Sequence, residues 1–90
     1  MEKTNIDTIY STLQLMNKNS IIEFLIKMET LNLDEFKDKT IILNYIDMIN
    51  NYVAIVKNMN LENEYLKKLK ALRISFIEYL NNRTANEINI

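Results

Sequence analysis

The 90-residue chain contains no glycine, proline, cysteine, histidine or tryptophan. Sandwiches, barrels and nucleotide-binding α/β folds use glycine for tight turns and close backbone approach, and proline at sheet edges. A chain that lacks both residues is expected to be helical, with Asn and Asp supplying the turns and caps. The chain is also rich in Asn, Ile and Lys, which is typical of an AT-rich genome such as that of a phage, a plasmid or a low-GC bacterium.

The missing residue types also exclude several kinds of chemistry. Without cysteine there is no disulfide scaffold, thiolate metal site or thiol nucleophile, and without histidine the usual general base and the commonest metal ligand are absent. No glycine-rich phosphate loop is possible. We therefore expect a protein that is not an enzyme, with no catalytic residues, no cofactor and no metal site.

Charge and hydropathy set the expected location of the chain. The formal net charge is −1, so no overall field attracts the protein to nucleic acid or to anionic lipid. The N-terminal segment MEKTNIDTIYSTLQ has polar residues throughout and no apolar region of the kind found in signal peptides. Unbroken apolar runs are short, as in VAIV at 53–56. These features predict a cytoplasmic protein with no membrane-spanning helix.

Helical periodicity is clear in the first third of the chain. Apolar residues recur every three or four positions in residues 5–16, and again in residues 20–31. Asn17, Lys18 and Asn19 interrupt the first pattern, and Ser20 followed by Glu23 forms a capping-box pattern that is typical of a helix start. The sequence thus predicts two short helices separated by a break at residues 17–19.

Two longer helices are expected in the remainder of the chain, over residues 40–58 and 61–82. The first of these has an apolar arc of roughly 180°, which favours contact with at least two neighbouring helices. Asn58 and Asn60 tolerate the left-handed conformation and favour a turn between the two helices. One continuous helix is the alternative, and it would be stable only when paired with another chain.

The connection over residues 32–39 is expected to hold about one helical turn around Phe36. Asn32 and Asp38 are the candidate N-caps within it.

These elements predict an all-α fold, a small antiparallel up-and-down bundle of four helices in which the first two are short. An equivalent description is a three-helix bundle whose first arm is broken at residues 17–20. We expect one domain over residues 1–83, followed by a frayed C-terminal tail over residues 84–90.

The best candidates for partner binding are tyrosines and one arginine. Tyrosine suits half-buried positions as well as interfaces, and arginine on an apolar helix face must pair, reach the solvent or contact a partner. Core packing is the competing interpretation for the tyrosines, and structural pairing for the arginine. The candidate residues are Tyr45, Tyr52, Arg73, Tyr65 and Tyr79.

The leading functional hypothesis is a protein-protein interaction module that acts as a homo-oligomer or as an adaptor or inhibitor of a larger protein. The alternative is a small nucleic-acid-binding regulator of the helix-turn-helix type, in which Lys67, Lys68 and Lys70 contact phosphates. Near-neutral charge counts against nucleic acid as the partner.

A third hypothesis comes from the predicted hairpin over residues 44–72, NYIDMINNYVAIVKNMNLENEYLKKLKAL. In helix length and loop placement it resembles the hairpins of bacteriocin self-immunity proteins, which are antiparallel four-helix bundles of similar size. The resemblance covers architecture and no motif, and it implies a role close to a membrane.

Overall fold

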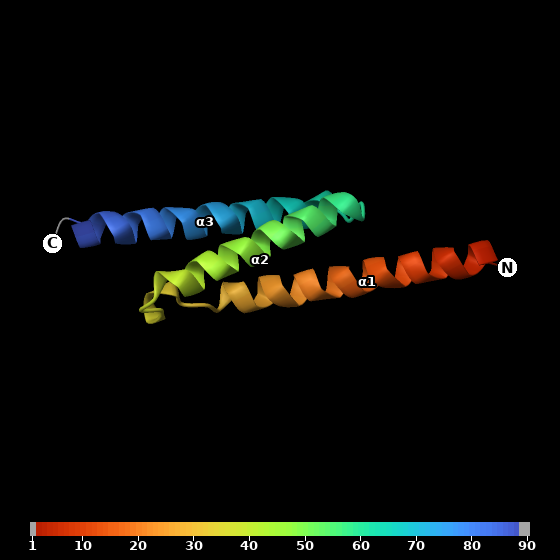
Figure 1. The fold of residues 1–90 in the computed structure, drawn as a ribbon, viewed down its shortest axis with the longest axis horizontal. Coiled ribbons are helices and arrows are strands. Elements are labelled where there is room, and N and C mark those ends of the chain that lie inside the picture. The colour runs from red at the N-terminus through yellow and green to blue at the C-terminus, as the bar shows by residue number, and fades with distance from the viewer. Residues whose placement is uncertain (1, 89–90) are drawn as a thin grey trace.

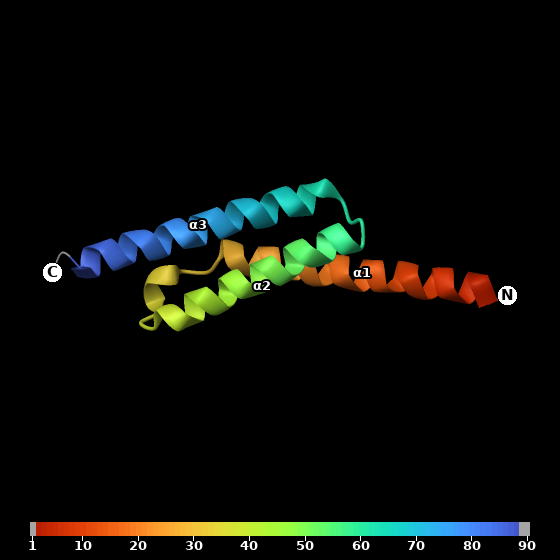
Figure 2. The ribbon, with the colours of Figure 1, turned by 45° about the horizontal axis from the view of Figure 1, so that its top comes forward.

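The computed structural model describes the backbone of residues 2–88 and the side-chain burial of residues 6–85. Within this range the chain forms three helices joined by two short connections: α1 (Glu2–Glu29), α2 (Lys39–Asn58) and α3 (Asn63–Ile88). Figures 1 and 2 show the helices running up, down and up along one long axis. The expectation of an all-α fold is confirmed for the described residues, but the bundle has three long helices and not four.

The prediction of a break at residues 17–19 was wrong, because α1 runs through it without interruption. The side chains that suggested a cap bond to the preceding turn of the same helix instead. Asn17 Nδ2 donates to the carbonyl oxygen of Leu13 at 2.9 Å, and Ser20 Oγ donates to that of Met16 at 3.1 Å. Asn and Ser are unfavourable in a helix interior by less than about 0.7 kcal/mol each, so they weaken a helix without ending it.

The connection between α1 and α2 has the predicted single turn and both predicted caps, but the turn ends before Phe36 and is not centred on it. It contains a single 3-10 turn, Leu33–Glu35, and the Asn32 side chain accepts the N–H of Asp34 at 3.1 Å. Asp38 caps α2 by accepting the N–H of Thr40 at 2.9 Å, and this hydrogen bond lowers the pKa of the Asp38 carboxyl.

The turn between α2 and α3 confirms that these are two helices. Of the two residues expected to tolerate the left-handed conformation, Asn58 and Asn60, it is Asn60 that adopts it, with a φ of 52°. The N–H of Met59 donates to the carbonyl oxygen of Ile55, and the N–H of Leu61 donates to that of Val56. These two bonds close the last turn of α2 and reverse the chain.

The core lies mainly between α2 and α3, and α1 packs against this pair through its second half. The backbones of α2 and α3 approach closely along much of their length, whereas α1 makes few such approaches. Large apolar side chains therefore span the space between α1 and the other two helices. The buried core residues are Ile21, Phe24 and Met28 from α1, Ile42, Ile49, Val53 and Val56 from α2, and Leu69 and Phe76 from α3.

Helix α3 extends to Ile88, so residues 84–88 of the segment expected to fray are helical. Contacts across the bundle hold this end in place. Arg83 donates to the carbonyl oxygens of Phe36 and Lys37 at 2.6 and 2.7 Å, and Lys39 Nζ lies 3.3 Å from Thr84 Oγ1. Residues 89 and 90 of that tail lie outside the described residues.

The three helices are staggered and do not end at the same level. The molecule measures 66 × 19 × 18 Å, while a helix of 28 residues such as α1 is only about 42 Å long. Figure 1 shows the reason: the N-terminal part of α1 projects beyond the α2–α3 turn at one end, and α3 projects at the other. The projecting part of α1 therefore has no neighbouring helix from its own chain beside it.

Candidate protein-interaction surface

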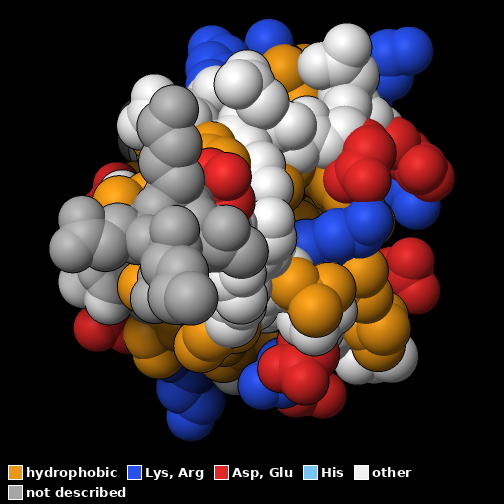
Figure 3. Space-filling model, turned by 90° about the vertical axis from the view of Figure 1, so that its right-hand side faces the viewer, with side chains coloured by type: hydrophobic (Ala, Val, Ile, Leu, Met, Phe, Trp, Pro, Cys, Tyr) orange, Lys and Arg blue, Asp and Glu red, His pale blue; other side chains and the backbone are white. Residues whose placement is uncertain are grey.

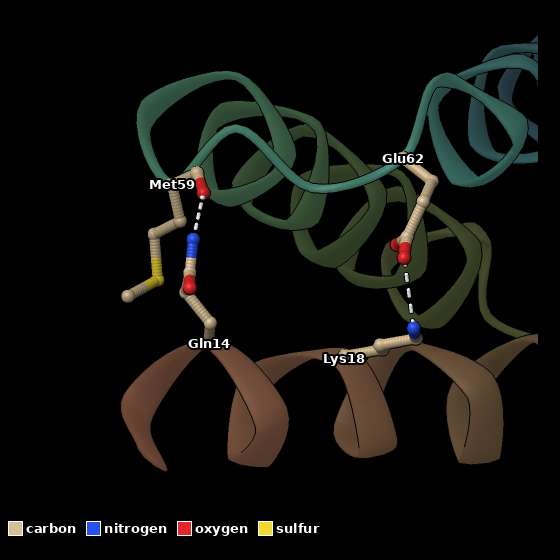
Figure 4. Close-up of polar contacts among 4 residues, drawn as sticks. All are labelled: Gln14, Lys18, Met59 and Glu62. Atoms are coloured by element: carbon tan, nitrogen blue, oxygen red, sulfur yellow. Dashed lines mark hydrogen bonds and ion pairs between the residues drawn. The ribbon is translucent and has the colours of Figure 1, made fainter. Parts of the chain in front are cut away.

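Helix α1 divides into two parts at the α2–α3 turn. Gln14 Nε2 donates to the carbonyl oxygen of Met59 at 2.8 Å, and Lys18 pairs with Glu62 at 2.8 Å, as Figure 4 shows. Asn17 Nδ2 also lies 3.1 Å from Met59 Sδ. We refer to residues 2–13, beyond these contacts, as the arm, and to residues 14–29 as the docked half.

The arm exposes a row of large apolar side chains. Ile6 is 64% exposed, Ile9 59%, and Tyr10 and Leu13 44% each. We call these four residues the arm stripe. Met16, at 60% exposure, continues the exposed apolar surface into the first turn of the docked half. Figure 3, which looks at the molecule from this end, shows hydrophobic side chains at the surface near the N-terminal residues drawn in grey.

The arm stripe lies on the side of α1 that faces the core further along the same helix. In the docked half that side carries Ile21, Phe24 and Met28, which are at most 8% exposed. At about 100° per residue, the arm stripe falls on the same side of the helix, and Leu15 falls on the opposite side. The core-facing apolar surface of α1 thus continues past the end of its own bundle.

The electrostatics of α1 differ along its length. Residues 6–16 include one charged residue, Asp7. The Lys18–Glu62 pair lies where the docked half begins, and its hydrogen bond raises the pKa of Lys18 and lowers that of Glu62. The Lys18 side chain is 33% exposed and that of Glu62 58%, so solvent screens the pair and its contribution to stability is small. The arm stripe therefore offers apolar contact with little charge selectivity.

The structure places two of the five candidate residues together. Tyr45 and Tyr52 line a groove of about 650 Å³ between α1 and α2. The ring of Tyr52 lies 4.9 Å from that of Phe24, and the ring of Tyr45 lies 5.9 Å from that of Phe36. Both tyrosines are half-buried, and these ring contacts contribute to packing.

The other three candidates lie apart from this groove and from one another. Tyr65 borders a second groove of about 440 Å³ between α1 and α3, and Lys18 Nζ lies 5.8 Å from its ring centre. Arg73 donates to the side-chain oxygen of Asn50 at 2.9 Å. Tyr79 donates to Asp34 at 2.6 Å, which raises the pKa of its hydroxyl. Each of the three makes a contact that links two parts of the bundle.

Tyr10 is the tyrosine that the sequence analysis left out, and it is exposed whereas the four selected tyrosines are half-buried. The four selected tyrosines lie one or two heptads apart on the two longer predicted helices, and Tyr10 has no such partner. Only one sequence feature pointed to the arm. No glycine or proline separates residues 2–29, so one helix longer than its partners was possible.

Two of the basic side chains in the first half of α3 have polar partners, while Lys67 and Lys70 are exposed. Lys68 Nζ lies 3.2 Å from Glu64 one turn earlier, and Arg73 is held by Asn50. Helices α2 and α3 lie antiparallel along each other (Figure 2). Helices α2 and α3 therefore form a helical hairpin. This arrangement does not by itself favour binding to nucleic acid.

No protein-family model, curated protein or solved structure matches this chain. Across the described residues, no group of three or more Asp, Glu, His or Cys side chains is placed to hold a metal ion. None of the described helices is both long and apolar enough to cross a membrane.

Proposed function

We propose that this is a non-enzymatic helical protein whose role is to bind another protein, and that the arm stripe is the contact surface. The single observation that carries the proposal is the exposure of Ile6, Ile9, Tyr10 and Leu13 on one side of a helix that projects from the bundle. Exposed apolar residues that occur singly need no explanation, whereas a contiguous row on a projecting element is typical of an interaction site.

The chemistry of the arm stripe fits helix-in-groove or helix-to-helix recognition. The apolar residues are spaced three and four positions apart, which is the pattern of anchors that an amphipathic helix inserts into an apolar groove. Tyr10 adds an amphipathic ring, a residue type enriched where interfaces form. The homo-oligomer, the adaptor and the inhibitor are three forms of this same function.

The proposal is tested by site-specific photo-cross-linking in cells that express the protein. A photoreactive amino acid at position 9 should form adducts with protein, while the same group at position 15 should form few. The pair is matched because Ile9 and Leu15 are 59% and 57% exposed on opposite sides of one helix. Equal adduct yields at the two positions, or none at either, would contradict the proposal.

Nucleic acid binding gives a different result in a separate assay. Duplex DNA binding that weakens with salt and is lost when Lys67, Lys68 and Lys70 are changed to Glu would replace this proposal with the regulator hypothesis.

A further inference from the structure

The residues of the arm stripe are spaced symmetrically along the helix. The intervals between Ile6, Ile9, Tyr10 and Leu13 are three, one and three positions, so the spacing is the same in both chain directions. When a second arm is laid antiparallel on the first, Ile6 lies opposite Leu13 and Ile9 lies opposite Tyr10. A surface that is complementary to its own rotated copy is the requirement for a two-fold symmetric interface.

The position of the bundle excludes a parallel pairing of two arms. From Gln14 onward, the side of α1 that carries Ile21, Phe24 and Met28 is covered by the chain's own α2 and α3, although Met16 stays exposed. A second α1 running parallel along the stripe would meet this hairpin. An antiparallel second α1 in this register places its Gln14 opposite residue 5 of the first chain. Its bundle therefore lies beside only the first turn of the first arm and extends past the N-terminal end of that arm, where Figure 1 shows no other part of the chain.

The available area is enough for a reversible dimer. The arm stripe and Met16, each about half exposed or more, present on the order of 500 Å² per copy, so that two copies bury about 1,000 Å², near the lower limit for a specific interface. Interfaces of this size are characteristic of weak, reversible association.

The charge of the arm favours a second copy over a lipid surface. Helices that lie on anionic membranes carry Lys or Arg along their polar face, whereas residues 6–16 contain Asp7 and no basic residue. Each arm carries Glu2, Lys3 and Asp7, a net charge of −1, so two arms can approach without strong repulsion; Asp7 is exposed and lies outside the stripe.

We propose that the partner of the arm stripe is a second copy of this chain, bound in an antiparallel two-fold pair centred between Ile9 and Tyr10. This inference rests on the proposed function and specifies its partner. In the dimer each arm covers the apolar stripe that the other copy leaves exposed to solvent. The two bundles lie at opposite ends of an elongated assembly.

Solution mass tests the dimer on the intact protein. Sedimentation equilibrium from about 1 to 200 µM should show a mass that rises from monomer to dimer with concentration. This range is wide enough to detect a weak dimer, because each tenfold step in concentration corresponds to about 1.4 kcal/mol of association free energy. Ile9→Glu should weaken dimerisation at least tenfold, and Leu15→Glu should leave it within about twofold, because Leu15 lies on the opposite side of the helix. Circular dichroism of both variants should show unchanged cooperative unfolding when the protein is dilute.

Single cysteines test the geometry, because the natural chain has none. Two Ile9→Cys chains would meet beside the two-fold axis and form a disulfide-linked dimer under mild oxidation. Ile26→Cys is the matched control, since Ile26 is 58% exposed and lies on the docked half. A mixture of Ile6→Cys and Leu13→Cys chains should give mainly the mixed disulfide, whereas a parallel pair would give the two self-linked species.

The outcomes separate this inference from the proposed function. A monomer at all concentrations, with Ile9→Cys linking no faster than Ile26→Cys, would overturn the dimer. Adducts to foreign proteins at position 9 would then still support the proposed function. Binding to vesicles of phosphatidylcholine and phosphatidylglycerol that is lost in Ile9→Glu, while the protein stays monomeric in solution, would also overturn the dimer and assign the arm to membranes.

Discussion

The arm and the docked half of α1 have similar patterns of apolar residues but different surroundings. Ile6 in the arm is 64% exposed, and Ile21 in the docked half is fully buried, although both residues lie on the same side of the same helix. The difference arises because α2 has 20 residues and α1 has 28, and because the α2–α3 turn meets α1 at Gln14. An apolar stripe is therefore buried in the core or exposed to solvent according to what lies beside it.

The arm can be helical without neighbouring helices because it continues a helix that is already formed in the docked half. An isolated helix of about 12 residues is marginal in water because nucleation is costly. The docked half already provides the nucleus, and the arm extends it one hydrogen bond at a time. The arm thus depends on the docked half for its structure, while the docked half does not depend on the arm.

The largest expected difference between the two parts is in core packing. Ile21→Ala should lower the free energy of unfolding by about 2–5 kcal/mol, because it leaves a cavity in the buried core. Ile6→Ala should change the same quantity by less than about 0.5 kcal/mol in dilute protein, since its side chain is already in water. Urea unfolding followed by circular dichroism measures both. Similar losses in the two variants would show that the arm is packed in solution.

Proline substitutions should affect the stability of the bundle much more in α2, which carries the core, than in the arm. Asn51 is exposed on α2, so Asn51→Pro should cost about 3 kcal/mol or more through the lost hydrogen bond and the steric clash in a helix that carries the core. Ser11 is equally exposed on the arm, and Ser11→Pro should reduce helicity while the unfolding midpoint of the bundle stays near that of the natural chain. A large fall in that midpoint would mean that the arm supports the bundle.

Substitutions in the α2–α3 turn, which rests on α1 between the arm and the docked half, should change stability by a smaller amount. Asn60 has a positive φ, and a β-branched residue there is strained, so Asn60→Val should destabilise the protein by about 1–2 kcal/mol. Asn60→Gly, the matched control, should differ little from the natural chain, because glycine adopts this conformation freely. Equal losses in the two variants would indicate that the Asn60 side chain matters more than its backbone.

The smallest effect is expected from the ion pair at the same boundary. The folded pKa of Glu62 lies below its usual value of 4.5, so its contribution is present above that pH and is lost as the pH falls through the folded value. The pKa of Lys18 is raised above 10.5, so its contribution is present below that pH and is lost as the pH rises through the folded value. The stability difference between the natural chain and Glu62→Gln should therefore be constant from about pH 6 to 9 and shrink at low pH. A difference that grows on acidification would contradict this assignment.

Helix existence and caps were predictable because their causes are local. Asp38 caps α2, and Asn60 adopts the left-handed conformation. Both features depend only on the residue itself and on a few neighbours in the sequence. The break at residues 17–19 was not predictable from the same rules. Ser20 can cap a new helix or bond to Met16 within an existing one, and the two outcomes differ by little free energy.

The candidate site was less predictable than the fold because exposure depends on contacts that are distant in sequence. Tyr45 and Tyr52 met the criteria for interface residues, and the structure gives them ring contacts with Phe36 and Phe24. Tyr10 has the same chemistry and is exposed, because no other helix reaches its level.

The sequence by itself determined that the described chain is helical, where the caps Asn32 and Asp38 and the turn at Asn60 lie, and which side of each helix is apolar, because these properties follow from side-chain spacing and local hydrogen bonding. Only the tertiary structure decided which part of that apolar surface is covered. The stagger of the three helices, set by the point where the α2–α3 turn rests on α1, buries Ile21 and leaves Ile6 exposed to solvent.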